Sequence, residues 1–290
     1  MAGLKIIKKR ISSVVNIRKI TKTMELVSAA KSRKMMVKVH DSLPYGNKVI
    51  ELLNTISGIT GDVELPLLRT EETPKKIILL VITANRGLCG GYNAQLLKLA
   101  RLRIKELQSQ QIPFDLHVIG KKGISYFKFI KVPVAKSWTH FDDGFVYLDA
   151  KTLATEYIQD FVNESYDQLE LISTRYISAV VQRAENFTIF PMTQAGAADD
   201  ATTKTANFIF EPSPDEILKT LLPHVAEYLF YKTVLEAITS EQIARRIAMK
   251  AASDAANDMN KSLTRIYNRK RQAAITQELA EIIAGADAIK

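Results

Sequence analysis

The chain has 290 residues, 47% of them hydrophobic and 24% charged, a composition that excludes disorder as the default and indicates a folded protein. The formal net charge of +9 permits a nucleic acid, an anionic membrane surface or an acidic protein as partner, without choosing among them. The single cysteine, Cys89, excludes an intramolecular disulfide and a cysteine-based zinc site. No apolar run is long enough to span a bilayer, and the basic N-terminus lacks the apolar core of a signal peptide, so we expect an unprocessed cytoplasmic protein.

The N-terminal segment, residues 1–58, is predicted to be one long amphipathic helix. Its apolar residues recur at three- and four-residue steps, as one face of a helix requires. The predicted stripe consists of Leu4, Ile7, Ile11, Val14, Ile17, Ile20, Met24 and Val27. Pro44 and Gly46 are expected to interrupt the helix, which can resume after a kink.

The charges of this segment have almost one sign. Glu25 is the only acidic residue before Asp41, whereas lysine and arginine recur throughout. A face of one charge favours an oppositely charged partner.

The middle of the chain, residues 74–208, changes to the pattern of an α/β domain. Apolar, β-branched runs alternate with helical patterns, which predicts a Rossmann-like layer with a largely parallel sheet. The predicted strands are 76–82, 114–119, 130–137 and 175–183, and the predicted helices are 92–108, 121–128 and 148–171. Pro133 favours an edge position for the third strand. Residues 194–207 read as a loop, and 208–212 as a short extended piece.

The loop Arg-Gly-Leu-Cys-Gly-Gly, residues 86–91, follows a strand and precedes a helix, a junction that can hold phosphate. It matches neither common nucleotide-binding fingerprint, so a tight structural turn is the favoured interpretation. The pair Asp142–Asp143 beside Gly144 favours a solvated turn. The four histidines have no metal-ligand spacing, and no nucleophile–base set is visible, so we expect no cofactor, no metal and no catalytic residue.

The C-terminal segment, residues 213–289, is predicted to be a second long helix, capped by Ser213 or Asp215 with Pro214 in its first turn. Its predicted stripe comprises Ile247, Ala251, Ala255, Met259, Leu263, Ile266, Leu279, Ile282 and Ala286. A helix of this length must project from any compact body and needs cover for its stripe.

The two terminal helices pair most simply as an antiparallel coiled coil. Small residues on both allow the backbones to approach closely: Ser28, Ala29, Ala30, Ala251, Ala252, Ala255 and Ala256. A helical bundle with both segments folded back on neighbours is the alternative.

Three stretches resemble the gamma subunit of F-type ATP synthase, as found in bacteria. They are IRKITKTMELVSAAKSRK at residues 17–34, ITANRGLCGGYNAQLLK at residues 82–98, and the segment from Ser240 to Ile289 that ends in ITQELAEIIAGADAI. The resemblance covers the whole chain.

The resemblance implies a rotor shaft. The coiled coil would stand inside a ring of three alpha and three beta subunits, and the α/β body would dock to the epsilon subunit and the c-subunit ring. Ion-driven turning of that ring would carry the catalytic beta subunits through their conformational cycle. The chain would do no catalysis itself and would lie peripherally on the cytoplasmic side of the bacterial inner membrane.

The resemblance also assigns contact residues. Those implied to meet the beta subunits are Met24, Arg245, Gln272, Thr276, Glu278 and Glu281, with Arg245 and Gln272 in one cluster. Glu211, in the extended piece before the C-terminal helix, is implied to meet the c ring.

Two other functions remain open from the residues alone. A basic coiled-coil protein that binds nucleic acid, or serves a structural role, fits the net charge, although no basic stripe interleaved with aromatic residues supports it. A nucleotide-dependent enzyme built on the α/β body has only the glycine-rich loop in its favour.

Overall fold

The computed structural model describes residues 2–60, 65–71, 73–192 and 211–287. They form two compact units, each described here by itself. The helix-pair unit consists of the residues up to Ala29 and those from Arg245, and the body unit runs from Ala30 to Ala244. Two helices, α1 (Ala2–Thr60) and α5 (Pro214–Asp287), each contribute to both units.

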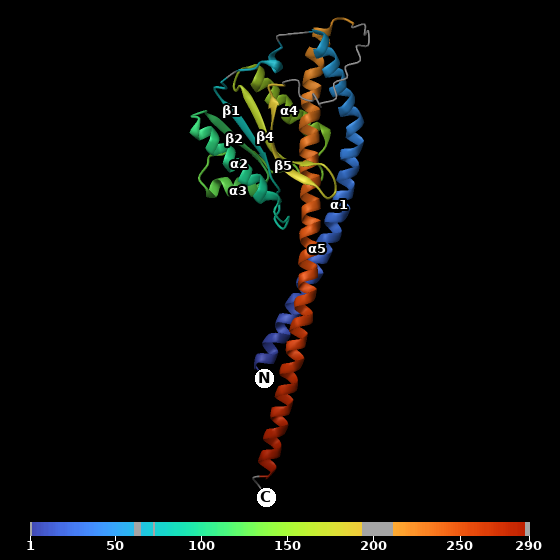
Figure 1. Ribbon diagram of the computed structural model, residues 1–290, viewed down its shortest axis with the longest axis vertical. Helices are drawn as coiled ribbons and strands as arrows, with labels where there is room; N and C mark the ends of the chain where they lie inside the picture. Colours follow the sequence, from blue (N-terminus) through green and yellow to red (C-terminus); the bar gives the residue numbers. More distant parts are fainter. Residues whose placement is uncertain (1, 61–64, 72, 193–210, 288–290) are drawn as a thin grey trace. The chain divides into compact units, whose positions relative to one another are not determined.

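The body unit is built on a five-stranded sheet in the order β3-β2-β1-β4-β5 (Figure 1). Its strands are β1 (Ile77–Ile82), β2 (Phe114–Ile119), β3 (Lys136–Trp138), β4 (Gln168–Tyr176) and β5 (Gln182–Phe190). The first four strands are parallel, and β5 pairs antiparallel with β4. The expectation of a largely parallel sheet is therefore confirmed.

Each face of the sheet is covered by helices. The alternation along β1 sends Leu79 and Val81 into a core shared with α2 (Tyr92–Ser109) and α3 (Lys121–Phe129). Ile78 and Leu80 enter the second core, which contains α4 (Tyr147–Val162) and the body-unit parts of α1 and α5. Burial of β1 on both faces explains its continuous apolar run.

Two predicted elements near β4 and β5, the helix at 148–171 and the strand at 175–183, differ from the structure. The helix predicted for 148–171 ends at Val162, and β4 begins at Gln168. Glu164 takes a left-handed backbone conformation with φ 56° just after α4, so a non-glycine residue ends the helix without a sequence signal.

The strand predicted for 175–183 is instead the hairpin between β4 and β5. The Ser178 hydroxyl oxygen accepts hydrogen bonds from the backbone N–H groups of Val180 and Val181, at 3.3 and 3.0 Å. A serine side chain thus makes the turn within an apolar run that reads as a strand.

The third strand is shorter than predicted. β3 covers Lys136–Trp138 rather than 130–137 and lies at the edge of the sheet, the position that Pro133 favours. The remaining strand and helix predictions agree with the structure to within two residues.

The expected interruption at Pro44 and Gly46 is wrong, because α1 continues through both residues. Gly46 has a packing role instead. A Cβ atom at this position would lie 1.8 Å from Cζ of Tyr228 on α5, so the lack of a side chain allows the two helices to approach. Tyr228 is buried.

The beginning of α5 follows the predicted cap. The Ser213 hydroxyl accepts a hydrogen bond from the Glu216 N–H at 3.3 Å, and Pro214 is the first helical residue. The loop predicted for 194–207 and residues 208–210 of the extended piece lie outside the described residues. In the described part of the chain, no helix combines the length and hydropathy that crossing a bilayer requires.

The glycine-rich loop forms the tight turn favoured from the sequence. Leu88 and Gly90 have φ of 64° and 58°, a conformation that suits a turn. The Asn93 side chain bridges the loop: its oxygen accepts from the Ala84 N–H at 3.0 Å, and its nitrogen donates to the Cys89 sulfur at 3.1 Å.

Candidate functional site

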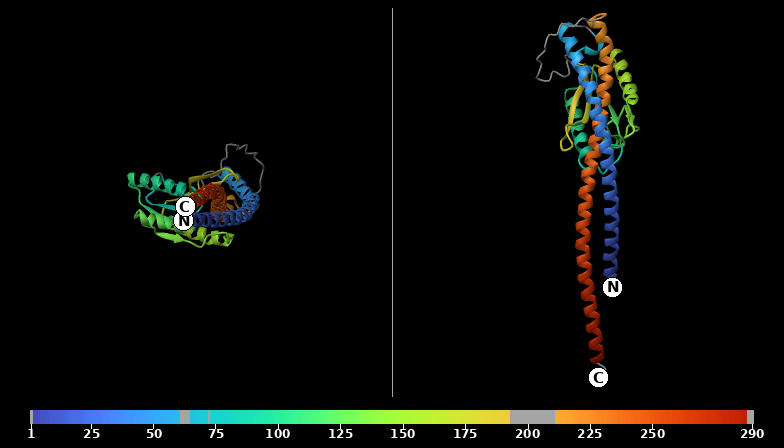
Figure 2. Two further views of the ribbon diagram at one scale, coloured as in Figure 1. Left: turned by 90° about the horizontal axis from the view of Figure 1, so that it is seen from below. Right: turned by 90° about the vertical axis from the view of Figure 1, so that its right-hand side faces the viewer.

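The helix-pair unit brings the two ends of the chain together, as predicted. The α1 and α5 segments lie side by side (Figures 1 and 2), and the Arg18 guanidinium donates to the Asn257 side-chain oxygen at 2.9 Å across the pair. The buried and half-buried positions follow alternating steps of three and four residues on both helices, which is coiled-coil packing. On α1 they include Leu4, Ile7, Ile11, Val14, Arg18, Thr21 and Ser28, and on α5 Met249, Ser253, Ala256, Asn260, Leu263 and Tyr267.

Met24 is half-buried, but the predicted apolar stripe of α1 is otherwise correct only as far as Val14. The buried seam then steps by four residues to Arg18 and continues through Thr21, whereas Ile17 and Ile20 are 52% and 60% exposed. The seam keeps its heptad spacing at the cost of apolar character, since the short steps to Ile17 and Ile20 would overwind it.

The stripe predicted for α5 is also mostly on the outside. Ile247, Met259 and Ile266 are each more than 40% exposed, and Ala251 and Ala255 are exposed as well. The small residues at the seam are Ser28, Ser253 and Ala256, all buried. The pair therefore has a small, partly polar seam and apolar side chains on its outer faces.

The structure does not gather the six residues expected to meet the beta subunits into one cluster. Met24 is half-buried and Arg245 is buried. Gln272 lies about 40 Å further along α5 than Arg245, at 1.5 Å per residue.

The other three expected residues, Thr276, Glu278 and Glu281, are exposed and follow Gln272 on α5. The Thr276 hydroxyl donates to the Gln272 carbonyl oxygen at 3.0 Å, and the Gln277 side chain donates to Glu281 at 2.9 Å. From Ile275 to Ala286 every residue is exposed. This end of α5 presents all its faces to solvent or to a partner.

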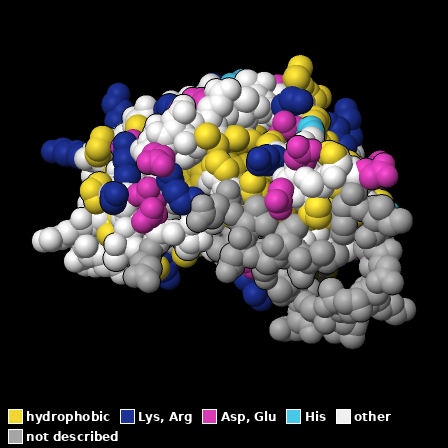
Figure 3. Space-filling model, turned by 90° about the horizontal axis from the view of Figure 1, so that it is seen from above, with side chains coloured by type: hydrophobic (Ala, Val, Ile, Leu, Met, Phe, Trp, Pro, Cys, Tyr) yellow, Lys and Arg dark blue, Asp and Glu magenta, His cyan; other side chains and the backbone are white. Residues whose placement is uncertain are grey.

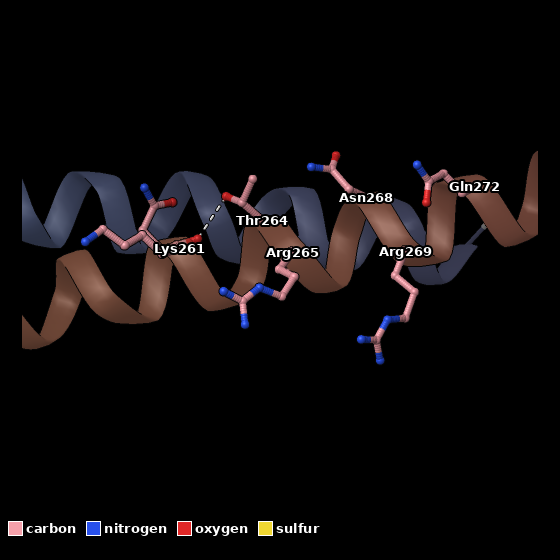
Figure 4. Close-up of a pocket in the computed structure, with 7 residues that line it drawn as sticks. Lys261, Thr264, Arg265, Asn268, Arg269 and Gln272 are labelled. Carbon is pink, nitrogen blue, oxygen red and sulfur yellow. Dashed lines mark hydrogen bonds between the residues drawn. The ribbon is translucent and has the colours of Figure 1, made fainter.

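A shallow, open cleft of about 610 Å³ runs along α5 beside α1 (Figure 4). It is lined by Asn260, Lys261, Thr264, Arg265, Asn268, Arg269 and Gln272. In Figure 4 the side chains of Arg265 and Arg269 point to one side of α5, and those of Asn268 and Gln272 point to the other.

The cleft lies in a basic band. No acidic residue occurs on α5 between Asp258 and Glu278, and none occurs on α1 before Glu25. The one-signed charge was expected on α1 but not on α5. The four-residue spacing of Lys261, Arg265 and Arg269 was the available signal.

Glu211, the expected c-ring contact, is exposed and stands just before α5. Among the described residues, no group of three or more histidine, cysteine, aspartate or glutamate side chains is arranged to hold a metal ion.

Comparisons with known proteins agree on one family. The ATP synthase family model matches residues 3–289. The ATP synthase gamma chain of Leptospira biflexa is 46% identical over 289 residues, covering 100% of both chains. That of Geotalea daltonii is 40% identical over 290 residues, again with 100% of both chains covered.

Solved structures share the fold. The rotor of the Euglena gracilis mitochondrial ATP synthase matches with a TM-score of 0.64 and 16% identity, covering 94% of this chain and 99% of that one. The central stalk and c-ring structure from Tetrahymena thermophila matches with a TM-score of 0.57 and 20% identity, covering 81% and 99%.

Proposed function

The chain belongs to the family of ATP synthase gamma chains, and from this premise we infer that it is the central-stalk rotor subunit of an F-type ATP synthase. It couples ion-driven rotation of a c-subunit ring to conformational cycling of the catalytic beta subunits. The same membership disfavours a nucleic-acid-binding function.

The observation that carries this proposal is the outward display of apolar side chains by the helix-pair unit. An ordinary coiled coil buries its large apolar residues between the helices. Here Ile17, Ile20 and Val27 on α1 and Ile247 and Met259 on α5 are all at least half exposed. Exposed apolar surface of this extent marks a protein interface. A close-fitting ring of partner subunits would cover it on all sides.

The basic band also indicates that the partner surface is acidic. The lysine and arginine side chains of α1 and of the α5 cleft repel one another unless a partner supplies carboxylates. Acidic loops of the ring of three alpha and three beta subunits would provide them. Exposed charge pairs of this kind are weak one by one, so the shaft can exchange them as it turns.

We propose that Met24, Arg245, Gln272, Thr276, Glu278 and Glu281 contact the beta subunits at two levels of the shaft. The first two residues lie near the body unit in sequence, and the other four lie towards the free end of α5. Because the shaft is asymmetric, each beta subunit meets a different face and therefore a different balance between its open and closed forms. The chain makes and breaks no bonds itself.

The body unit meets the membrane part of the complex. Figure 3 shows the end of the body unit where α1 ends and α5 begins, with apolar side chains near its centre and charged groups around them. Glu211 stands beside the beginning of α5. This end docks to the c ring and the epsilon subunit, which holds the chain peripherally on the cytoplasmic side of the bacterial inner membrane.

The test is the substitution Gln272→Ala in the reconstituted head of the complex. Gln272 is exposed, so the fold of the chain should be unchanged. Loss of an interface contact worth about 1 kcal/mol lowers ATP hydrolysis about fivefold. Asp254→Ala, at an exposed residue of the same helix outside the proposed contact set, is the control. Equal turnover in both variants and the wild type would remove Gln272 from the contact.

A further inference from the structure

The loop between β3 and α4 contacts both long helices, at residues that lie close to the first and last positions of the body unit in the sequence. Lys31 is the second residue of that unit, and Gln242 lies two residues before its last, Ala244. Asp143 forms an ion pair with Lys31 of α1, and its other carboxylate oxygen accepts a hydrogen bond from the Gln242 side chain of α5 at 3.2 Å. The expected turn at Asp142 and Asp143 is present, but Asp143 is only partly solvated because it contacts both helices.

Further contacts join the same loop to both helices, and we name residues 141–147 the clamp loop. The Lys38 ammonium of α1 donates to the Phe145 carbonyl oxygen at 3.1 Å. The Phe145 ring is buried and stacks on Tyr231 of α5, with ring centroids 5.8 Å apart. The Tyr147 hydroxyl donates to Glu227 of α5 at 2.7 Å, and burial together with this carboxylate raises the pKa of Tyr147, so the phenol keeps its proton.

The two aspartates of the clamp loop have different roles. Asp142 acts within the loop: its side chain accepts from the Gly144 N–H at 3.0 Å, and its carbonyl oxygen accepts from the Phe145 N–H at 3.0 Å. Asp143 points outward to the helices, and its side chain is only 28% exposed. Charge-assisted contacts in a partly buried place are stronger than exposed ones.

We propose that Asp143 is a positioning residue that fixes α1 and α5 to the α/β body at the point where torque passes between them. This inference rests on the proposed rotor function. In that function the c ring turns the body unit, so within this unit the load passes between the α/β sheet and the two long helices, which the clamp loop joins. Asp143 bonds to both helices at once, so it adds to the contacts that resist twisting of the body relative to them.

The experiment compares Asp143→Asn with Asp142→Asn in the assembled complex. ATP hydrolysis by the soluble head turns the helix pair without a load on the body, whereas ion-driven ATP synthesis in membranes drives torque through the clamp loop. For Asp143→Asn we expect the rate of ATP synthesis to fall about fivefold, because losing one such contact changes an equilibrium constant by about that factor. The rate of ATP hydrolysis should stay within about twofold of wild type. Asp142→Asn should leave the ratio of synthesis to hydrolysis unchanged.

Two further variants separate transmission from folding. Lys31→Met breaks the α1 side of the contact without changing the loop and should lower the same ratio. The exchanged pair Lys31→Glu with Asp143→Lys should restore part of it, because the opposite charges meet again, although a lysine at 143 cannot accept the hydrogen bond that Gln242 donates. Thermal melting of each purified chain identifies any variant that has simply lost its fold.

A normal ratio in both Asp143→Asn and Lys31→Met would overturn the proposal, as would an equal loss of synthesis in Asp142→Asn. A complex whose wild-type chain supports neither hydrolysis nor synthesis would instead contradict the rotor function itself. The two failures are therefore distinguishable.

Discussion

The contact between Gly46 and Tyr228 allows a sharp test of how the two long helices pack in the body unit. In Gly46→Ala the new Cβ would lie 1.8 Å from Cζ and 1.9 Å from the hydroxyl oxygen of a buried ring, so the ring or a helix must move. Overpacking of this kind costs typically about 1–3 kcal/mol, and occasionally more. The gain in helix propensity from glycine to alanine offsets about 1 kcal/mol. Because the obstacle includes ring carbons rather than a flexible end, we expect a net loss of about 2 kcal/mol.

The assay is urea unfolding of the purified chain, followed by circular dichroism. Gly285→Ala is the matched control, since Gly285 also lies in a helix but has no atom within 4 Å of the place that an added methyl group would take. The control should be neutral or slightly stabilising. A Gly46→Ala chain as stable as the control would refute the close approach of α1 and α5 at this point.

Three further predictions concern stability. Burial lowers the pKa of His117 to about 4, whereas in the unfolded chain it is near 6.5. Between these two pH values the unfolded chain binds a proton that the native chain does not, so the free energy of unfolding should fall by about 3 kcal/mol as the pH drops from 6.5 to 4. In His117→Gln the fall should be smaller, as measured by urea unfolding. In the native chain the Arg103 guanidinium lies 2.6 Å from the buried Glu170 carboxylate. Arg103→Met leaves that carboxylate without its partner and should lower the free energy of unfolding by about 3–5 kcal/mol in the same assay, whereas Arg103→Met with Glu170→Leu should recover most of the loss. Ala256→Leu should force the helix pair apart and lower the melting temperature of the purified chain, whereas Ala255→Leu, on the exposed side, should leave it nearly unchanged. Equal melting of the two variants would show that Ala256 does not face α1.

Much of the fold could be predicted from the sequence where burial and period agree. The continuous apolar run of β1, buried on both faces, and the strand Phe114–Ile119 are clear because nothing competes with their pattern. The errors arose where a polar side chain or an unusual backbone conformation decides the structure. Ser178 makes a turn inside an apolar run, and Glu164 ends a helix without glycine.

The candidate site was less predictable, because an apolar stripe shows which residues need cover but not which partner provides it. Ile17 and Ile20 continue the apolar stripe of α1, but α5 packs against Arg18 and Thr21 instead. Residues whose apolar side chains are covered only in an assembly look like core residues in one sequence. The role of Asp143 was hidden for a similar reason, since its partners are more than a hundred positions before and about a hundred after it in the chain.

Rotation is the central claim, and it can be observed directly. Cys89 is buried, so a cysteine introduced at the 84% exposed Phe129 gives a specific attachment point for a probe on the body unit. With the head immobilised and ATP supplied, we expect the probe to turn continuously in one direction, at a rate that follows ATP hydrolysis. A head that hydrolyses ATP while the probe stays fixed would contradict the rotor function.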